Sequence, residues 1–381
     1  MTKEGWTTVT LGGIAENISL RVDDPSKSGL DRFVGLVHLD SGSVTVSRWD
    51  STESVTSSMK KFQAGDVLLA RRNAHLRRAS AVDFEGVCSG DAYVLREKPD
   101  AIVPGLLKYI LNTNRFWEYA IANADGSMST RVKWKQLENY HFDLPVIKIQ
   151  SDTEKILESI ICEQMNMKNS VKEIIRIRNK LVDDYRARCR DKKSLGEIYE
   201  TQLGKMLSKK SREGPEQSYY LGNINVQWQE VVTSDLNSMS FNSKEREKFQ
   251  LIKGDILVCE GGEVGRCAIW NDDREMYFQK ALHRLRLIEN EYYPSELFIW
   301  VMHSMARRGD LRALTGGGTI PHLVQRDLKK IQLPFSEKSE MKGINDILQE
   351  IEKILLMLDE RSIISSEKIS SITSHFLEAE I

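Results

Sequence analysis

The chain has few residues of the kinds that mark a secreted, metal-binding or membrane protein. Its five cysteines form no Cys-x-x-Cys pair, and an odd, scattered set is typical of reduced thiols rather than of a disulfide framework. No apolar run approaches the length of a membrane span, and the first residues lack the apolar core of a signal peptide. We therefore expect a cytoplasmic protein that has no membrane partner.

The motifs of the common enzyme classes are also missing. The sequence contains no His-Glu-x-x-His, no Gly-x-Ser-x-Gly and no Walker A segment. None of its eight prolines is adjacent to another, which excludes the Asn/Asp-Pro-Pro-aromatic motif of amino-methyltransferases. No Glu-x-Lys follows Pro99 and Asp100 at a distance suited to a nuclease. These absences together predict a protein that binds without catalysing, with no cofactor and no metal.

Length and charge limit what such a protein binds. A chain of 381 residues with 40% hydrophobic residues suits two domains with real cores. The formal net charge is −1, whereas nucleic-acid-binding proteins are often basic overall. Any cationic surface must therefore be local, or partner subunits must supply the rest.

The two halves of the chain repeat one another at a separation of 189 positions. The repeated segments are Gly-Asp-Val/Ile-Leu at 65–68 and 254–257, and Leu-Pro at 144–145 and 333–334. Single residues coincide at the same separation in the pairs Arg77/Arg266, Ala79/Ala268, Ala92/Ala281, Thr130/Thr319 and Gln136/Gln325. The halves also open alike, with Leu-Gly-Gly-Ile at 11–14 and Leu-Gly-Glu-Ile at 195–198. A repeat of this length is a duplicated domain, and a duplicated protein suits a target with two parts.

Each half ends in a long stretch with heptad spacing, which predicts helices over about 151–191 and from 344 to 376. The first seam is Thr153, Leu157, Ile160, Gln164, Met167, Val171, Ile174, Arg178, Leu181 and Tyr185. The second is Ile344, Leu348, Ile351, Leu355, Leu358, Ser362, Ser365, Ile369, Ile372 and Phe376. Separate helical hairpins or oligomerisation stalks are one interpretation. We favour antiparallel pairing of the two helices as a rigid spacer, because either apolar stripe would otherwise need a partner from elsewhere.

The rest of each half is typical of an α+β domain. In the first half we expect strands at 33–39, 67–70 and 92–95 and a helix over 103–122. In the second we expect strands at 219–221, 256–258 and 282–288 and a helix over 295–306. The predicted fold is thus α+β, with two pseudo-symmetric globular domains separated by two long antiparallel helices that form a coiled coil. The predicted segments are 1–148 and 193–336 for the domains and 149–192 and 337–381 for the helices.

Polar residues follow the Gly-Asp strand of each half. The first set has four arginines and a histidine, which can bind phosphate and still offer a fork to guanine O6 and N7. The second is acidic and rich in glycine, where Glu260 can accept from cytosine N4 and glycines allow close backbone approach. A solvated charged loop is the alternative. The candidates are Arg71, Arg72, His75, Arg77, Arg78, Glu260 and Arg266.

A second pair of loops precedes Leu-Pro in each half. Residues 316–318 are a triple glycine that lacks the Walker A lysine, so the segment suits contact with a DNA backbone better than nucleotide binding. A plain loop leading into a helix remains the alternative. The candidates are Ser129, Thr130, Arg131, Lys133, Lys135, Gly318, Thr319, His322 and Gln325.

In their order along the chain, these segments resemble the specificity (S) subunits of type I restriction-modification systems. The resemblance rests on 62–68, 75–78, 84–91, 252–257, 265–266, 318–323, 327–328 and 333–334, together with the alternating helices. The first half departs from it, with Ser-Thr-Arg at 129–131 where the second has Gly-Thr-Ile-Pro.

The resemblance implies two target-recognition domains, each reading one half of a bipartite, gapped site in double-stranded DNA. It implies that the paired helices set the gap and dock two methyltransferase subunits, with restriction subunits added in the full complex. Catalysis would belong to those partners. A coiled-coil adaptor without DNA specificity, or an enzyme with an unfamiliar site, are the competing hypotheses.

Overall fold

The computed structural model describes residues 5–126, 129–314 and 322–377. It divides into two compact units. Unit 1 comprises Met1–Met167 with Glu360–Ile381, and unit 2 comprises Lys168–Asp359. Each unit therefore contains a globular part and a segment of both long helices, and the four-segment division of the sequence stays a prediction.

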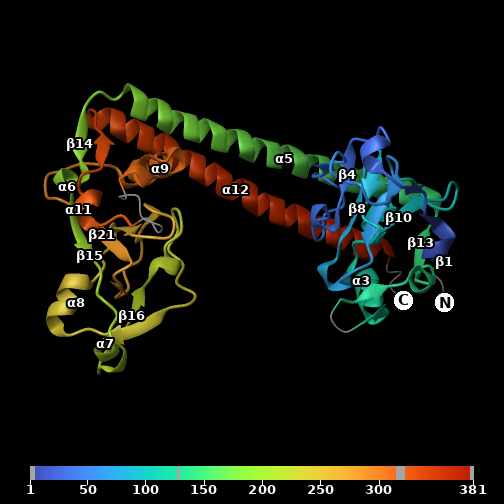
Figure 1. Cartoon of the computed structure of the whole chain (residues 1–381), viewed down its shortest axis with the longest axis horizontal. Helices are drawn as coiled ribbons and strands as arrows, with labels where there is room; N and C mark the ends of the chain where they lie inside the picture. Colours follow the sequence, from blue (N-terminus) through green and yellow to red (C-terminus); the bar gives the residue numbers. More distant parts are fainter. Residues whose placement is uncertain (1–4, 127–128, 315–321, 378–381) are drawn as a thin grey trace. The chain divides into compact units, whose positions relative to one another are not determined.

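The long helices pair with one another in each unit. They are α5 (Ile147–Arg188) and α12 (Lys338–Leu377). In unit 2, Arg178 pairs with Glu352 and Arg188 with Glu340, both at 2.8 Å, so the helices are antiparallel. Figure 1 draws α5 in green beside α12 in red.

In unit 1 the same helices are joined by an ion pair of Arg361 with Glu163 and a hydrogen bond of 3.1 Å from Gln164 to Ser366. All the heptad positions predicted above are buried or half-buried. The predicted helix pair is therefore confirmed within each unit, including the polar seam positions Gln164 and Arg178, which bond across it.

The described residues of unit 1 form two larger sheets, two short ones and four short helices. Its four-stranded sheet has the order β2 (Ala15–Ile18), β10 (Ala92–Glu97), β7 (Val67–Ala70), β8 (Ala79–Ala81). Its five-stranded sheet has the order β3 (Arg21–Val22), β6 (Met59–Phe62), β9 (Gly86–Cys88), β4 (Arg32–Val34), β5 (Asp50–Ser51). The short sheets pair β1 (Trp6–Thr10) with β13 (His141–Pro145) and β11 (Ala124–Asp125) with β12 (Arg131–Val132). The helices are α1 (Leu11–Ile14), α2 (Leu107–Ile110), α3 (Asn114–Ala122) and α4 (Trp134–Leu137), with 3-10 turns η1 (Pro25–Lys27), η2 (Leu36–His38) and η3 (Ala74–Leu76).

Unit 2 repeats this plan with a smaller second sheet. Its four-stranded sheet has the order β15 (Tyr199–Leu203), β21 (Leu282–Leu287), β18 (Ile256–Cys259), β19 (Cys267–Ile269). Its three-stranded sheet has the order β17 (Asn237–Ser240), β16 (Gln217–Leu221), β20 (Tyr277–Phe278), and β14 (Lys192–Ser194) pairs with β22 (Gln332–Pro334). The helices are α6 (Leu195–Ile198), α7 (Lys209–Glu213), α8 (Ser243–Phe249), α9 (Ser295–Arg308), α10 (Asp310–Ala313) and α11 (Gln325–Leu328), with the 3-10 turn η4 (Asn223–Asn225).

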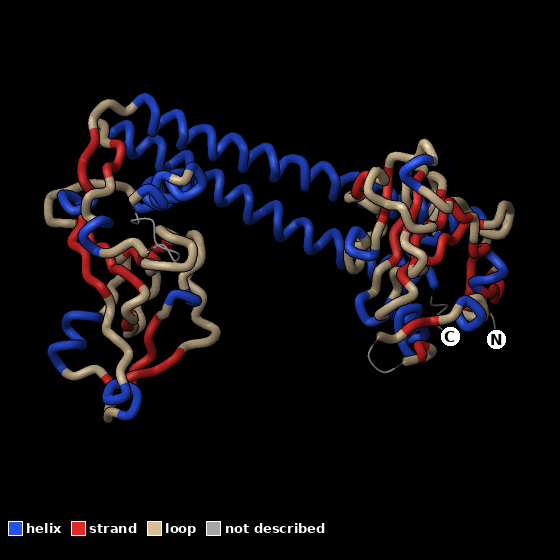
Figure 2. The backbone as a smooth tube through the Cα atoms, viewed as in Figure 1, coloured by secondary structure: helices blue, strands red, loops and turns tan. Residues whose placement is uncertain are grey.

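The pseudo-symmetry lies in the four-stranded sheets, which are antiparallel throughout and have the same order in both units. Figure 2 draws the strands of both units in red. The core of unit 1 includes Leu157 of α5 and Phe376 of α12, and that of unit 2 includes Tyr185 and Leu348. Burial of these side chains anchors the helices to each globular part. The α+β fold with two related domains and long paired helices is confirmed.

Two predicted elements of unit 1 are wrong in part. The strand expected over 33–39 ends at Val34, because the amide of Gly35 donates to Nδ1 of His38 (3.0 Å) and the chain turns into η2. The helix expected over 103–122 is two helices, since Thr113 caps α3 by accepting from the amide of Phe116. In unit 2 the helix expected over 295–306 is confirmed as α9.

Candidate functional site

The Gly-Asp turns of the two units fold in the same way. Asp66 accepts two hydrogen bonds from Arg96 (2.7 and 2.8 Å), and Asp255 accepts two from Arg286 (2.8 and 2.7 Å). Each aspartate is 1% exposed and also accepts from the backbone amide three residues earlier. The turns therefore fix the start of β7 and β18, whose far ends open into the candidate loops.

Those loops differ in length by one residue. We name residues 71–77 the arginine loop and residues 260–265 the glycine loop. The amide of Ala70 donates to the carbonyl of Arg78 (3.0 Å), and that of Cys259, 189 positions later, donates to Arg266 (2.8 Å). The counterpart of Arg266 is therefore Arg78, and the predicted pairing of Arg266 with Arg77 is wrong by one residue.

The other coincidences at 189 positions shift as well, because the connections differ in length. Strand register makes Cys267 the counterpart of Ala79 and Leu282 that of Ala92. The amides of Gly12 and Gly196 donate to Glu138 and Lys329, so Gln325 corresponds to Trp134 rather than to Gln136. Thr319 lies outside the described residues.

Three arginines of unit 1 surround one carboxylate. Arg71 and Arg72 each donate to Asp91 (3.0 Å), Arg131 lies 3.7 Å from it, and Arg72 also donates to Ser129 (3.0 Å). Burial would raise the pKa of Asp91, but the hydrogen bonds from Arg71 and Arg72 outweigh it and lower that pKa. The cluster keeps an excess of positive charge, on side chains that are 35 to 53% exposed.

The backbone holds the second segment of unit 1 against the arginine loop. The amide of Val132 donates to the carbonyl of Arg71, and that of Asn73 to the carbonyl of Thr130, both at 2.9 Å. Tyr93 donates to the carbonyl of Val132 (2.9 Å). The structure thus brings together the two loops that the sequence singled out separately.

The remaining candidates of unit 1 differ in what they contact. Arg78 donates to the carbonyls of Leu36 and Arg72, and burial lowers its pKa, so it braces the backbone. Arg77 has a φ of 48° and donates to Asn114, and His75 is exposed on η3. Lys133 pairs with Asp125 (2.9 Å), and Lys135 is exposed on α4.

Glu260 takes the place of Arg71 in unit 2. Its amide donates to Ala281 (2.9 Å), as that of Arg71 does to Asp91, and its carbonyl accepts from Leu323 (2.7 Å), as that of Arg71 does from Val132. Unit 2 therefore has a glutamate beside an alanine where unit 1 has an arginine beside an aspartate.

The other candidates of unit 2 are mixed. Arg266 is 15% exposed and braces Asn223, and Gln325 donates to the backbone and side chain of Thr201, so both hold the fold. His322 is exposed at the position of Arg131. Gly318 and Thr319 lie outside the described residues. The roles proposed for these residues stay predictions.

Sequence reasoning gave Asp91 no role. It lies directly before a predicted strand, 20 positions after Arg71, and only the pairing of β7 with β10 brings the two together. The signal that could have revealed Asp91 is an acidic residue directly before one strand (β10) combined with arginines directly after a neighbouring strand (β7).

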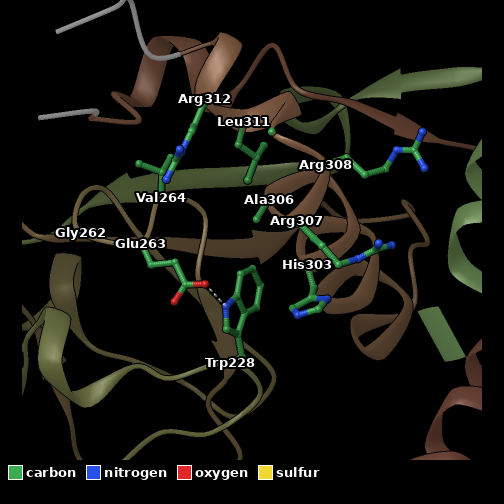
Figure 3. Close-up of a pocket in the computed structure, with 11 residues that line it drawn as sticks. Trp228, Gly262, Glu263, Val264, His303, Ala306, Arg307, Arg308, Leu311 and Arg312 are labelled. Carbon is green, nitrogen blue, oxygen red and sulfur yellow. Dashed lines mark hydrogen bonds between the residues drawn. The ribbon is translucent and has the colours of Figure 1, made fainter. Parts of the chain in front are cut away.

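A cavity of about 550 Å³ in unit 2 has the glycine loop as one wall and α9 and α10 as the other (Figure 3). Trp228 donates to Glu263 across it (2.7 Å). Burial and the nearby Arg178 and Arg307 lower the pKa of His303. The side chains of Arg307 and Arg308 both pair with Asp183 of α5.

The described residues form no metal-binding cluster, and three of the cysteines are buried. No group of three or more His, Cys, Asp or Glu among the described residues could hold a metal ion. Cys88, Cys259 and Cys267 are buried, and burial raises the pKa of the Cys88 thiol to about 12. Among the described helices, none is long and apolar enough to cross a membrane.

Comparison with known proteins agrees with this architecture. Residues 190–366 match the family described as "Type I restriction modification DNA specificity domain". In structure, the chain is similar to a chain of a solved structure described as the structural basis of complex assembly and conformational transition of the type I R-M system. The identity is 15%, 100% of both chains is covered and the TM-score is 0.65. It is also similar to the type I restriction-modification system S subunit from M. genitalium, with 12% identity, 99% of this chain and 97% of that chain covered and a TM-score of 0.58. No curated protein matches the sequence.

Residues 190–366, which include most of unit 2, are thus similar to a DNA specificity domain of the type I restriction-modification class. The whole chain has the fold of an S subunit, and the resemblance inferred from the sequence is confirmed.

Proposed function

We propose that this chain is the non-catalytic specificity subunit of a type I restriction-modification complex. Each unit reads one half of a bipartite site in double-stranded DNA. The arginine loop with 129–135 serves the first half-site, and the glycine loop with the segment around His322 serves the second.

One observation carries this proposal: a single backbone frame presents opposite chemistry in its two copies. Arg71 and Glu260 make equivalent backbone hydrogen bonds, yet one side chain donates and the other accepts. In the major groove, arginine pairs with guanine O6 and N7, whereas glutamate accepts from cytosine N4. A protein that reads two different half-sites needs this difference, whereas an adaptor without DNA specificity does not.

The partners we propose are two methyltransferase subunits, with restriction subunits in the full complex. The long helices support docking, because α12 exposes Leu356 by 65% and Met357 by 68% within unit 2, and α5 exposes Met165 by 55% within unit 1. Exposed apolar side chains of this size on a helix are typical of a protein interface. Paired α5 and α12 would then set the gap between the half-sites.

The test is to produce the chain with the methyltransferase subunit of its own system in a host that lacks adenine methylation. Mapping methylated adenines over the host genome should give one motif with two defined parts and an unspecified gap. Methylation without a motif, or the absence of a stable complex with the methyltransferase, would contradict the proposal.

Single substitutions then assign the loops. Arg131→Ala should relax the motif in one half-site, and Glu260→Gln should alter the other, each weakening recognition by about 1–3 kcal/mol if the side chain contacts a base. Uniform loss on all DNA would assign the residue to phosphate. Lys253→Ala is a matched control, since Lys253 is exposed in the turn before β18, opposite the glycine loop.

A further inference from the structure

Both units contain a 3-10 turn with the same internal bond. In η2 the amide of Gly35 donates to Nδ1 of His38 (3.0 Å), and in η4 the amide of Gly222 donates to Oδ1 of Asn225 (2.9 Å). Each turn follows a strand that pairs in parallel with a neighbour, β4 with β9 and β16 with β20. The turns are therefore counterparts, although their sequences, Leu-Val-His and Asn-Ile-Asn, share no residue.

The middle residue of each turn is aliphatic and almost fully exposed. Val37 is 72% exposed and Ile224 is 75% exposed, the highest values among the exposed large hydrophobic residues of the described chain. A single exposed aliphatic residue is ordinary on a protein surface. Two at equivalent positions of a duplicated frame, where the other turn residues differ, point to a shared contact.

Side chains from elsewhere hold both turns rigid. In unit 1, Arg78 donates to the carbonyl of Leu36 (3.0 Å) and Arg48 to that of Val37 (2.8 Å). In unit 2, Arg266 donates to the carbonyl of Asn223 (2.9 Å) and Gln227 to that of Ile224 (2.9 Å). The aliphatic tips are therefore presented in a fixed place, which lowers the entropy lost when they bind a partner.

Hydrogen bonds also connect both turns to the candidate loops. Arg78 donates to the carbonyl of Arg72 in the arginine loop (3.3 Å) as well as to η2. In unit 2, Asn223 donates to the carbonyl of Gly261 in the glycine loop (3.3 Å). Each aliphatic tip is thus part of the same rigid assembly as the loop that we assign to a half-site.

We propose that Val37 and Ile224 are specificity-determining residues that contact the C5-methyl group of a thymine, one in each half-site. The inference rests on the proposed function. Thymine is the base that offers an apolar group in the major groove, and small aliphatic side chains are its partners there. The polar loops cannot recognise that methyl group by hydrogen bonding, so an apolar tip beside each loop completes the readout.

The experiment uses the chain in complex with its methyltransferase subunits and a duplex that carries the motif found by methylation mapping. Each thymine is replaced in turn by deoxyuridine, which removes only the methyl group. One position in each half-site should bind about fourfold more weakly, the change for one buried methyl group. In Val37→Ala the first of these positions should become insensitive to the replacement, and in Ile224→Ala the second.

Matched controls are Leu20→Ala in unit 1 and Ile252→Ala in unit 2, which remove aliphatic side chains that are 58% and 50% exposed. Ile252 lies in the turn before β18, at the strand end opposite the glycine loop. Both controls should keep the full deoxyuridine response.

The inference is overturned if no deoxyuridine position weakens the wild-type complex, or if Val37→Ala and Ile224→Ala respond as the wild type does. It is also overturned if either variant loses its methyltransferase subunits, which would make the tips protein contacts. Failure of the proposed function looks different, because the wild-type complex would then show no sequence preference.

Discussion

Arg71 of unit 1 and Glu260 of unit 2 occupy equivalent positions, each directly after the corresponding strand of its own four-stranded sheet, and their side chains have opposite charge. The residues that accept their backbone amides differ as well: Asp91 in unit 1 and Ala281 in unit 2. The backbone hydrogen bonds that place each loop are alike. They fix the position of the loop but do not restrict which side chain it carries. Recognition can therefore change between units, or between related proteins, without a change of fold.

The first test is whether the shared frame has the same strength in both units. Asp66→Ala and Asp255→Ala each remove a buried carboxylate from a two-bond arginine pair. Breaking such a pair costs about 3–5 kcal/mol, and we expect about 3 because Arg96 and Arg286 are partly exposed. Urea unfolding with hydrogen exchange should localise each loss to its own unit.

Asp83→Ala, which removes an exposed carboxylate from unit 1, is the control and should be neutral. Clearly unequal losses from the two aspartates would show that the turns are not equivalent in energy, whatever their geometry.

The second test uses the residue before each bracing arginine, which is left-handed in both units: Gly265 with a φ of 83° and Arg77 with a φ of 48°. Gly265→Ala should cost about 2 kcal/mol, because a Cβ there would clash with the side chain of Leu311 in a conformation that alanine avoids. Arg77→Gly should raise stability by up to about 1 kcal/mol. Thermal unfolding measures both changes.

Arg77→Gly also separates fold from function, since it keeps the loop conformation and removes the guanidinium. Loss of DNA recognition in a variant that is at least as stable would assign Arg77 to the interface. Unchanged recognition would remove it from the candidates.

Sequence reasoning recovered the features that depend on periodicity and on buried turns. Heptad spacing gave α5 and α12 because one face of each must be apolar, and the Gly-Asp turns were visible because their aspartate cannot vary without loss of the buried pair. The exact register was lost. The glycine loop is one residue shorter than the arginine loop, and one residue is enough to misassign Arg77 for Arg78.

The side-chain contacts between neighbouring strands also could not be predicted from the sequence. Asp91 meets Arg71 only because β7 and β10 are neighbours, and η2 forms because His38 bonds back to Gly35, where β propensity favours a strand. Such contacts depend on tertiary packing, which local patterns do not encode.

The third test concerns pH, because His283 of unit 2 takes the place of Tyr93. Both side chains bond the carbonyl of the equivalent segment, Leu323 or Val132, at 2.9 Å. Burial lowers the pKa of His283 below its ordinary 6.5. The unfolded chain then binds more protons than the fold below pH 6.5, so unit 2 loses stability as the pH falls through that range.

Unit 1 has a tyrosine rather than a histidine at this position. Hydrogen exchange between pH 5 and 7.5 should therefore show unit 2 weakening at the acid end. His283→Gln, which keeps a donor and does not titrate, should reduce the effect, and the half-buried His303, whose pKa burial also lowers, accounts for what remains. A response of equal size in unit 1 would contradict this assignment.

The smallest effect is expected from Asp91→Ala, which removes the carboxylate from the arginine cluster. Unit 2 already has an alanine, Ala281, at the position equivalent to Asp91. Freed from Asp91, Arg71 and Arg72 should bind phosphate more readily, so affinity for random DNA should rise a few-fold and its salt dependence should steepen by about one unit of log–log slope. Discrimination in one half-site should fall, because the guanidinium groups lose their fixed direction. Asp125→Ala removes the same charge from the exposed pair with Lys133 and should leave discrimination intact. If both variants weaken discrimination alike, net charge rather than the geometry of the cluster sets recognition in unit 1.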